Sequence, residues 1–247
     1  MASIALQPTR YRPVTGHAHF VGMLLLLLAL TGYNWYSFHL ANLPGAAHAS
    51  DPTAIARAMT RGLTHSITIE WILLLYGWAG VRRYGGSMRD LTGGRWQNWK
   101  QLGLDVLIAA GFWCFWSASA EIVWLIIGKS HARAGGALHF PPIGALNIAL
   151  WFGLCISAGF CEEVVYRGYL QKQIQALSNS TLFAVLAQGL IFGVSHIYQG
   201  YKPVIVISVL GIEYGLLAWS RRNLRSAMLS HAWSDMVAGY FKFLWGW

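Results

Sequence analysis

Carboxyl, guanidinium and imidazole groups occur in three apolar stretches of the sequence, each within a pair of residues spaced four apart. The pairs are Glu163 with Arg167, Phe192 with His196, and His231 with Asp235, and Glu162 directly precedes the first pair. A charged side chain at the centre of a membrane helix costs roughly 2.5–3.5 kcal/mol on insertion scales. Three such insertions are hard to explain as accidents, so the pattern indicates an active site buried in a membrane.

The first pair favours carboxylate chemistry. Residues four apart share a face of a helix, so Glu163 and Arg167 can form an ion pair along one stripe. Glu162 is rotated by about 100° from Glu163 and can face a different partner. A carboxylate in a poorly solvated site can act as a general base. The alternative is an ion pair at a helix end, in the headgroup layer.

The two other pairs add histidines that could work with this acid. His196 follows Phe192 on a face that also carries Gly189, a small residue that permits close helix approach. Asp235 can fix the tautomer and orientation of His231, or the two can form a polar clasp between helices. Unrelated causes would have to place polar groups in three neighbouring helices. A shared site is therefore the simpler interpretation.

Composition assigns the chain to a class. It is 55% hydrophobic and 11% charged, where soluble domains carry about 25% charged residues. Several windows of about 20 apolar residues are long enough to cross a bilayer. Thirteen Trp and eleven Tyr suit the interfacial belts of a membrane protein. We therefore expect an all-α, polytopic bundle of transmembrane helices.

Seven membrane spans, or eight, are expected. Residues 1–142 would hold three spans and residues 143–247 a catalytic core of four. A signal peptide ending at Ala47-His48-Ala49 is the alternative for the first span, but that site lies far beyond the leucine-rich run. The expected spans are Phe20–Tyr36, Thr64–Val81, Leu102–Gly128, Ile143–Leu177, Thr181–Tyr198, Pro203–Ser220 and Ser226–Trp247.

The net charge of +9 has a topological explanation. Lys and Arg lie in short loops, without a long basic patch, so we expect no nucleic-acid partner. Twelve of them fall on the side of the N-terminus and six on the other, which places the N-terminus in the cytoplasm. The three cysteines lie in apolar segments and form no C-x-x-C. They predict neither a disulfide framework nor a zinc knuckle.

The order and spacing of the motifs resemble a known family. The segment Glu162–Arg167 matches E-E-x-x-x-R, Phe192–His196 matches F-x-x-x-H, and His231–Asp235 matches H-x-x-x-[ND]. Together they resemble the CPBP family, which includes the CAAX prenyl endopeptidases and the bacterial Abi proteins linked to bacteriocin self-protection. The resemblance covers about Phe152–Tyr240, and the stretch Gly211–Leu217 also fits the family pattern.

The resemblance implies an intramembrane endopeptidase. In this assignment Glu162 is the general base that activates water together with His196. His231 and the residue at Asp235 stabilise the oxyanion, and Glu163 with Arg167 supports them. The family often has Asn at the last position. An ionised Asp cannot donate a hydrogen bond, so Asp235 would be protonated or would orient His231.

The resemblance also bears on cofactors, substrates and location. The family is often labelled metalloprotease, and a zinc ion on Glu162, His196 and His231 is the alternative to the metal-free site that we favour. We expect a peptide or membrane-protein substrate, contact with lipid, and a bacterial inner (plasma) membrane, and oligomeric state stays open. The alternative function is a non-catalytic scaffold or bacteriocin-immunity protein. A proton-coupled transporter has less support, because the sequence has no inverted repeat.

One geometric requirement follows from these spans. His196 falls near the far end of the fifth span and His231 near the start of the seventh, so they converge only if helices are tilted, broken or longer than drawn. Glu70, near the start of the second span, is expected to be partnered or interfacial. Glu213, in the sixth, should pair with an Arg or line the cavity. Cys161 should be a small buried hydrophobic residue.

Overall fold

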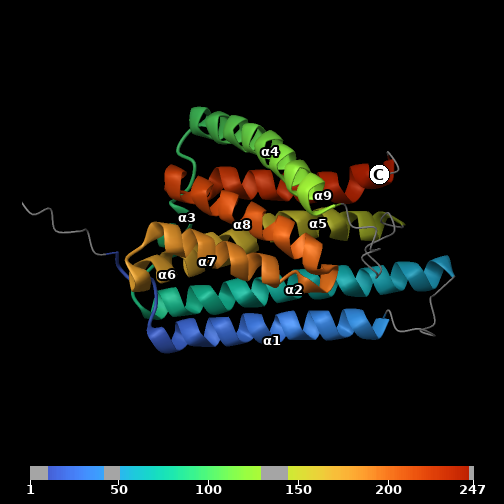
Figure 1. The fold of residues 1–247 in the computed structure, drawn as a ribbon, viewed down its shortest axis with the longest axis horizontal. Coiled ribbons are helices and arrows are strands. Elements are labelled where there is room, and N and C mark those ends of the chain that lie inside the picture. The colour runs from blue at the N-terminus through green and yellow to red at the C-terminus, as the bar shows by residue number, and fades with distance from the viewer. Residues whose placement is uncertain (1–10, 42–50, 129–143, 245–247) are drawn as a thin grey trace, which may run out of the picture.

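A computed structural model describes residues 11–41, 51–128 and 144–244, with side chains described up to Val237. Ala47-His48-Ala49 and the N-terminal Arg10 lie outside these residues. The described chain is helical throughout, which confirms the all-α class. The helices are α1 (His17–Ala41), α2 (Pro52–Arg83), α3 (Met88–Thr92), α4 (Trp99–Ile127), α5 (Gly144–Glu162), the π-helix η2 (Glu163–Leu170), α6 (Gln171–Ser178), α7 (Thr181–Val194), the 3-10 helix η3 (Ile197–Gln199), α8 (Tyr201–Arg221) and α9 (Arg225–Leu244) (Figure 1).

Four segments within the described residues are long and apolar enough to cross a membrane: His17–Leu40, Trp99–Ile127, Gly144–Ser178 and Tyr201–Arg221. The expected count of seven spans is therefore not confirmed. The helix α7 has 14 residues, which rise about 21 Å, less than the ~30 Å of a hydrocarbon core. The chain turns back after α7 through η3 and enters α8.

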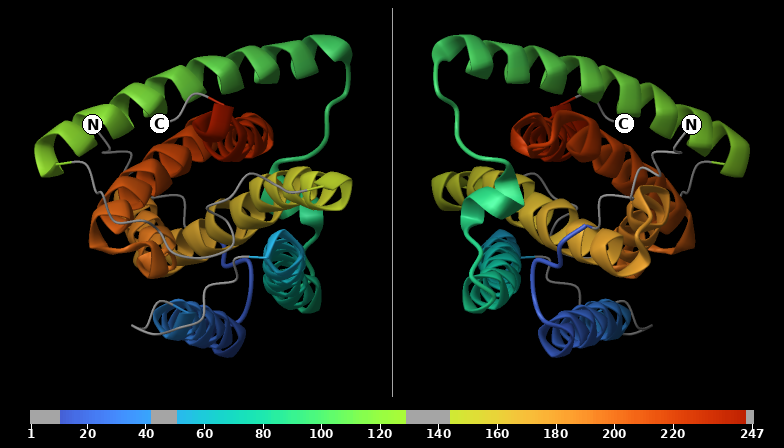
Figure 2. Two further views of the ribbon diagram at one scale, coloured as in Figure 1. Left: turned by 90° about the vertical axis from the view of Figure 1, so that its right-hand side faces the viewer. Right: turned by 90° about the vertical axis from the view of Figure 1, so that its left-hand side faces the viewer.

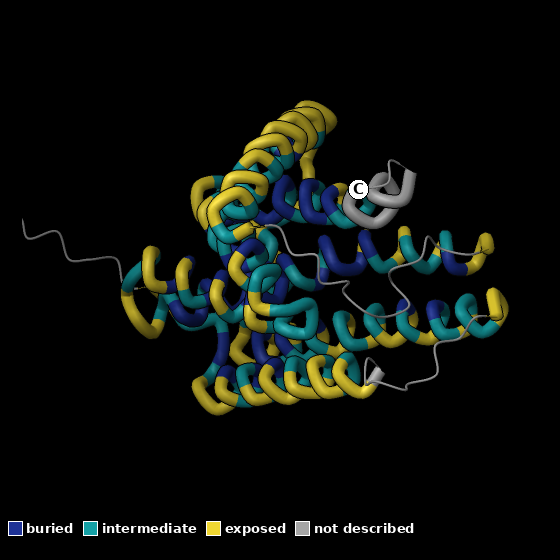
Figure 3. Tube along the Cα trace, turned by 45° about the vertical axis from the view of Figure 1, so that its right-hand side comes forward, coloured by how far each residue is buried: buried dark blue, intermediate teal, exposed yellow. Residues whose placement is uncertain are grey.

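The helices form a bundle with α1 on one side and α4 on the opposite side, and the other long helices lie between them (Figure 2). The outer helix α4 packs on α8 and α9. It exposes large apolar side chains, among them Leu107, Leu125 and Ile126. Buried residues concentrate at the centre of the bundle (Figure 3). An outer apolar surface of this kind is typical of helices that face lipid.

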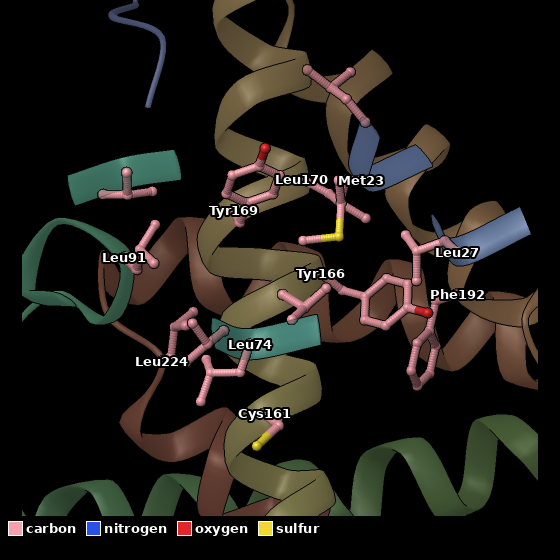
Figure 4. Packing of buried hydrophobic residues seen from close by; sticks show 14 of the residues in the cluster. Met23, Leu27, Leu74, Leu91, Cys161, Tyr166, Tyr169, Leu170, Phe192 and Leu224 are labelled. Carbon is pink, nitrogen blue, oxygen red and sulfur yellow. The ribbon is translucent and has the colours of Figure 1, made fainter. Parts of the chain in front are cut away.

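The π-helix η2 lies at the centre of the core. All eight of its residues are buried. Tyr166, Tyr169 and Leu170 pack among side chains from helices far apart in the sequence, including Met23, Leu27, Leu74, Leu91, Phe192 and Leu224 (Figure 4). Single turns of π-helix inside α-helices occur frequently at functional sites. Here the π-helix directly follows Glu162, within one continuous helical rod.

The helix α2 begins earlier than its apolar residues suggest. Asp51 caps it by accepting hydrogen bonds from the backbone N–H groups of Thr53 and Ala54, and Pro52 occupies the first turn. Proline suits that position because its missing N–H would have no partner inside the helix. The helix is 32 residues long, so Glu70 lies in its middle instead of near its start.

Candidate active site

One cavity of about 660 Å³ lies in the interior of the bundle. Residues of the last four expected spans line one part of it, and α1 and α2 also form part of its wall. Its polar lining includes Thr31, Asn34, His65, Ser66, Glu70, Glu162, Tyr166, Ser195, His196, Tyr198, Gln199, His231 and Asp235. The four residues predicted to be catalytic, Glu162, His196, His231 and Asp235, therefore all face the same cavity.

The ion pair predicted within the first motif is formed and buried. Arg167 Nη1 donates to Glu163 Oε1 at 2.9 Å, and neither side chain is exposed. The guanidinium also donates from Nη2 to the Gly211 carbonyl at 3.3 Å and lies 4.4 Å from the centre of the Phe192 ring. Because both partners are inside the protein, the alternative of a helix-end pair in the headgroup layer is wrong.

Glu163 also holds His231. The distance from His231 Nδ1 to Glu163 Oε1 is 2.8 Å. A carboxylate accepts hydrogen bonds, so Nδ1 carries the proton in this contact and Nε2 is directed elsewhere. The His231 ring stacks on Tyr214, with centroids 5.4 Å apart. Glu163 and Tyr214 together fix the orientation of the imidazole, a role that the sequence suggested for Asp235.

The other two acids stand near His231 without a hydrogen bond to it. Its Nε2 is 3.6 Å from Glu162 Oε2 and 3.7 Å from Asp235 Oδ2. The Glu162 side chain is 21% exposed and that of Asp235 37%, whereas the Glu163 side chain is fully buried. Glu162 and Asp235 are thus open to the cavity, with Glu163 behind them.

His196 follows the end of α7, where the chain turns. Its Nδ1 is 2.9 Å from the Phe192 carbonyl oxygen. A carbonyl only accepts, so Nδ1 carries the proton and Nε2 is left as the free ring nitrogen. The Tyr166 hydroxyl donates to Ser195 Oγ at 2.9 Å, which in turn donates to the Ile191 carbonyl. These bonds tie the turn that carries His196 to the π-helix.

Close helix approach explains how these residues converge. A Cβ added to Gly159 of α5 would lie 2.8 Å from the backbone nitrogen of Ala232 in α9. Gly189 of α7 approaches α8 as closely, with 2.9 Å between an added Cβ on Gly211 and the Gly189 Cα, which confirms the prediction for Gly189. The short α7 ends at Val194, and His196 in the turn after it lines the same cavity as the other site residues.

Comparison with known proteins agrees with this geometry. Residues 144–237 match the family model described as type II CAAX prenyl endopeptidase Rce1-like. This segment is similar to the Rce1-like family. No curated protein and no solved structure matches the chain. The Rce1-like segment contains all six predicted site residues, and the match supports a protease-type enzyme in an integral membrane protein.

The cavity extends beyond the Rce1-like segment, and the position of one acid there was misjudged. Glu70 of α2 lines the cavity from mid-helix, because α2 starts before the expected span. Ser157 hydrogen-bonds its carboxyl group, which confirms the expectation of a partnered residue, while its Oε2 is buried without a hydrogen-bond partner among the described residues. The helix-start pattern Asp51-Pro52, which places Glu70 in the middle of a long helix, was the signal in the sequence that could have shown this position.

Two further expectations inside the Rce1-like segment can be compared with the structure. Glu213 accepts a hydrogen bond from Ser119 of α4 at 2.5 Å and does not line the cavity. Its face of α8 is turned toward α4, so the prediction that it lines the cavity was wrong, and no Arg of the described residues forms an ion pair with it. Cys161 is 1% exposed and belongs to the core cluster, so its expected role as a small buried residue is confirmed.

The fit of the site to a metal ion can be tested from the donors. Among the residues that the structure describes, no three His, Cys, Asp or Glu side chains come together as a metal site would require. Glu162, His196 and His231 were the candidate ligands within the Rce1-like segment. They face one cavity. His231 Nδ1 is bound to Glu163, which leaves Nε2 as the free ring nitrogen, and Glu162 Oε2 is 3.6 Å from this Nε2.

Proposed function

We propose that the protein is an intramembrane endopeptidase that hydrolyses a peptide bond with water activated by Glu162 and His196. The observation that carries the proposal is the position of these two residues with His231 and Asp235 on one interior cavity. The Rce1-like match supports the same class of reaction. The bundle in which the cavity lies supports the same setting, because it holds four segments long and apolar enough to cross a membrane.

Two hydrogen-bond acceptors activate the water molecule that attacks the peptide. The Glu162 carboxylate takes a proton from a water molecule, while the free Nε2 of His196 accepts a second hydrogen bond and orients it. The hydroxide oxygen bonds to the scissile carbonyl carbon, and negative charge develops on the carbonyl oxygen. The proton held by Glu162 then passes to the leaving nitrogen as the C–N bond breaks. Glu162 thus returns to its starting state.

The oxyanion needs donors at the moment it forms. His231 donates from Nε2 in its doubly protonated form, in which the Nδ1 proton is bound by Glu163. Asp235 supplies a second donor only when it is protonated, and otherwise it faces the His231 Nε2 as an acceptor. Arg167 keeps Glu163 in place through the 2.9 Å ion pair. The buried pair therefore positions His231 without touching the substrate.

The decisive experiment measures cleavage of a transmembrane or prenylated reporter peptide by purified protein. Glu162→Gln and His196→Ala should each lower kcat/KM by about 10²–10⁴-fold. Glu213→Gln is the matched control, because Glu213 is an acid of the same segment that faces α4. Cleavage that is unchanged in both site variants would contradict the mechanism. A wild-type protein that cleaves no reporter would favour the scaffold or immunity role.

The same assay tests the metal-free mechanism. The donors of the described residues support hydrolysis without a metal ion, so a chelator should leave the rate unchanged and active protein should contain no stoichiometric zinc. Loss of activity on chelation, restored by added zinc, would contradict this part of the proposal. Metal analysis of the active fraction provides the second measurement.

We further propose a bacterial inner (plasma) membrane with the N-terminus in the cytoplasm. The support is a gathering of basic residues at the end of the bundle where α1 starts and α2 ends: Arg12, Arg82, Arg83, Arg89, Arg95, Lys100, Arg221, Arg222 and Arg225. A single cysteine introduced at Arg12 should be protected from an impermeant thiol reagent in intact cells. One introduced at Thr53, at the other end, should be labelled.

A further inference from the structure

The wall of the cavity formed by α2 carries an acid that the proposed hydrolysis does not use. Glu70 lines the cavity beside Ser66 and Ile69. Ser157 of α5 hydrogen-bonds its carboxyl group, but Oε2 is buried and has no partner among the described residues. A polar atom buried without a hydrogen bond is costly, and such atoms are normally paired. Because Glu70 lines the cavity, a group bound there can supply the partner of Oε2.

The charges around the cavity show what that partner would be. The lining contains three carboxyl groups, those of Glu70, Glu162 and Asp235, and no Lys or Arg side chain among its residues. Glu162 and Asp235 are near enough to act electrostatically on Glu70. Arg167 is outside the lining and is already bound to Glu163. A cationic group in the cavity would meet carboxylates, whereas an acidic group would meet like charges.

We propose that Glu70 is a specificity-determining residue that binds a basic side chain of the substrate, lysine or arginine, close to the scissile bond. The proposal rests on the proposed function, because it places this subsite in the same cavity as the reacting groups. The cationic group would complete the pairing of Glu70 Oε2, while the apolar stem of the side chain would lie along the apolar lining. Substrates with an acidic residue at the same position would be disfavoured.

The test uses the full chain in nanodiscs of neutral lipid, so that lipid charge does not compete. Apolar reporter peptides are made in sets of three that differ only in one residue, Lys, Gln or Glu, placed at successive positions around the cleavage region. Binding is measured with the Glu162→Gln variant, which keeps peptides intact, and kcat/KM with otherwise unaltered protein. For at least one position we expect the Lys peptide to be preferred over the Glu peptide by on the order of 30-fold or more.

The preference must depend on Glu70. In Glu70→Gln the ratio of Lys to Glu peptide should fall well below the wild-type ratio, in binding and in cleavage, with thermal unfolding within a few degrees of wild type. Glu213→Gln should keep the wild-type ratio. Equal binding of the three peptides at every position, a preference that Glu70→Gln leaves undiminished, or no peptide binding at all would overturn the subsite.

The subsite and the hydrolysis can fail separately. Selective binding through Glu70 without any cleavage would support the subsite and contradict the proposed hydrolysis. Cleavage that does not distinguish Lys from Glu at any position would support the hydrolysis and overturn the subsite.

Discussion

Two buried carboxylates join helices in this protein, and they differ in how completely their oxygens are bonded. Asp105 of α4 accepts hydrogen bonds on both oxygens, from Trp96, Arg221, Arg225 and Ser226. Glu163 of η2 accepts from Arg167 and His231 on Oε1 alone. Its Oε2 has no hydrogen-bond partner among the described residues.

This difference in hydrogen bonding distinguishes a structural cluster around Asp105 from a reactive centre around Glu163. Asp105 accepts bonds on both oxygens and does not line the cavity, and it ties α4 to the end of α8 and to the start of α9. The cluster around Glu163 is incomplete, and its neighbours Glu162 and Asp235 remain open to the cavity. Unsatisfied polar groups in a native interior are costly and need an explanation. Substitutions should therefore affect stability at one cluster, and activity together with stability at the other.

The largest effect is expected from Arg167→Met. It leaves the Glu163 carboxylate buried without its cation, and breaking such a pair costs about 3–5 kcal/mol. We expect a strongly lowered unfolding midpoint in detergent, followed by tryptophan fluorescence, and loss of reporter cleavage. The double variant Glu163→Gln/Arg167→Met should regain part of the stability but not the activity, because His231 loses its acceptor. Arg222→Met, at an exposed turn, is the control. An Arg167→Met protein as stable as wild type would refute the comparison.

Asp105→Asn should destabilise without inactivating. An amide cannot accept on both sides from two guanidinium groups, and hydrogen bonds to charged groups are worth about 1.5–3 kcal/mol each. The unfolding midpoint should fall, while kcat/KM of the folded fraction should stay within about twofold of wild type, because Asp105 does not line the cavity. A larger loss of kcat/KM at a temperature where the variant is folded would show that the clasp also shapes the active site.

In contrast to Asp105→Asn, Gly159→Ala should affect the rate of cleavage more than the stability of the fold. Its Cβ would lie 2.8 Å from the Ala232 nitrogen and the Met228 carbonyl oxygen, so α5 and α9 have to separate. Overpacking of this kind costs about 1–3 kcal/mol, and the 2.8 Å contact between Glu163 and His231 would lengthen. Cleavage should fall at least tenfold (about 1.4 kcal/mol of barrier). Gly153→Ala is the matched control, since its Cβ would meet one side chain atom at 4.0 Å. Equal activity of both variants would contradict the argument.

The spacing of residues within one motif predicted the contacts that form within one helix or at one small residue. The Glu163–Arg167 pair forms because residues four apart on one helical rod stay neighbours, even where that rod becomes a π-helix. The close approach at Gly189 follows from a missing side chain. In contrast, the bond between Glu163 and His231 depends on the angle and depth at which α5 and α9 meet. Nothing in the spacing within either motif specifies that relation.

The extent of the cavity was missed for a different reason. The apolar run of the second expected span starts at Thr64. Hydropathy alone does not indicate that the twelve preceding residues, 52–63, are also helical. Asp51-Pro52 is a helix-start pattern that would have placed Glu70 at mid-helix. The length of α7 was also overestimated, because Ile197 and Tyr198 extend the apolar run, whereas the helix ends at Val194.

The smallest effect of a substitution is expected at a third carboxylate, that of Asp51, which is exposed. Hydrogen bonds from the Thr53 hydroxyl and from the backbone N–H groups of Thr53 and Ala54 hold the pKa of Asp51 below its usual value. A lowered folded-state pKa means that the cap stabilises above the unfolded pKa of about 3.9 and is lost as the pH falls through the folded value. Protection of the first α2 amides from hydrogen exchange should therefore fall below pH 4. Asn also caps but does not titrate, so Asp51→Asn should lose this pH dependence. Equal pH dependence in both proteins would assign the change to another group.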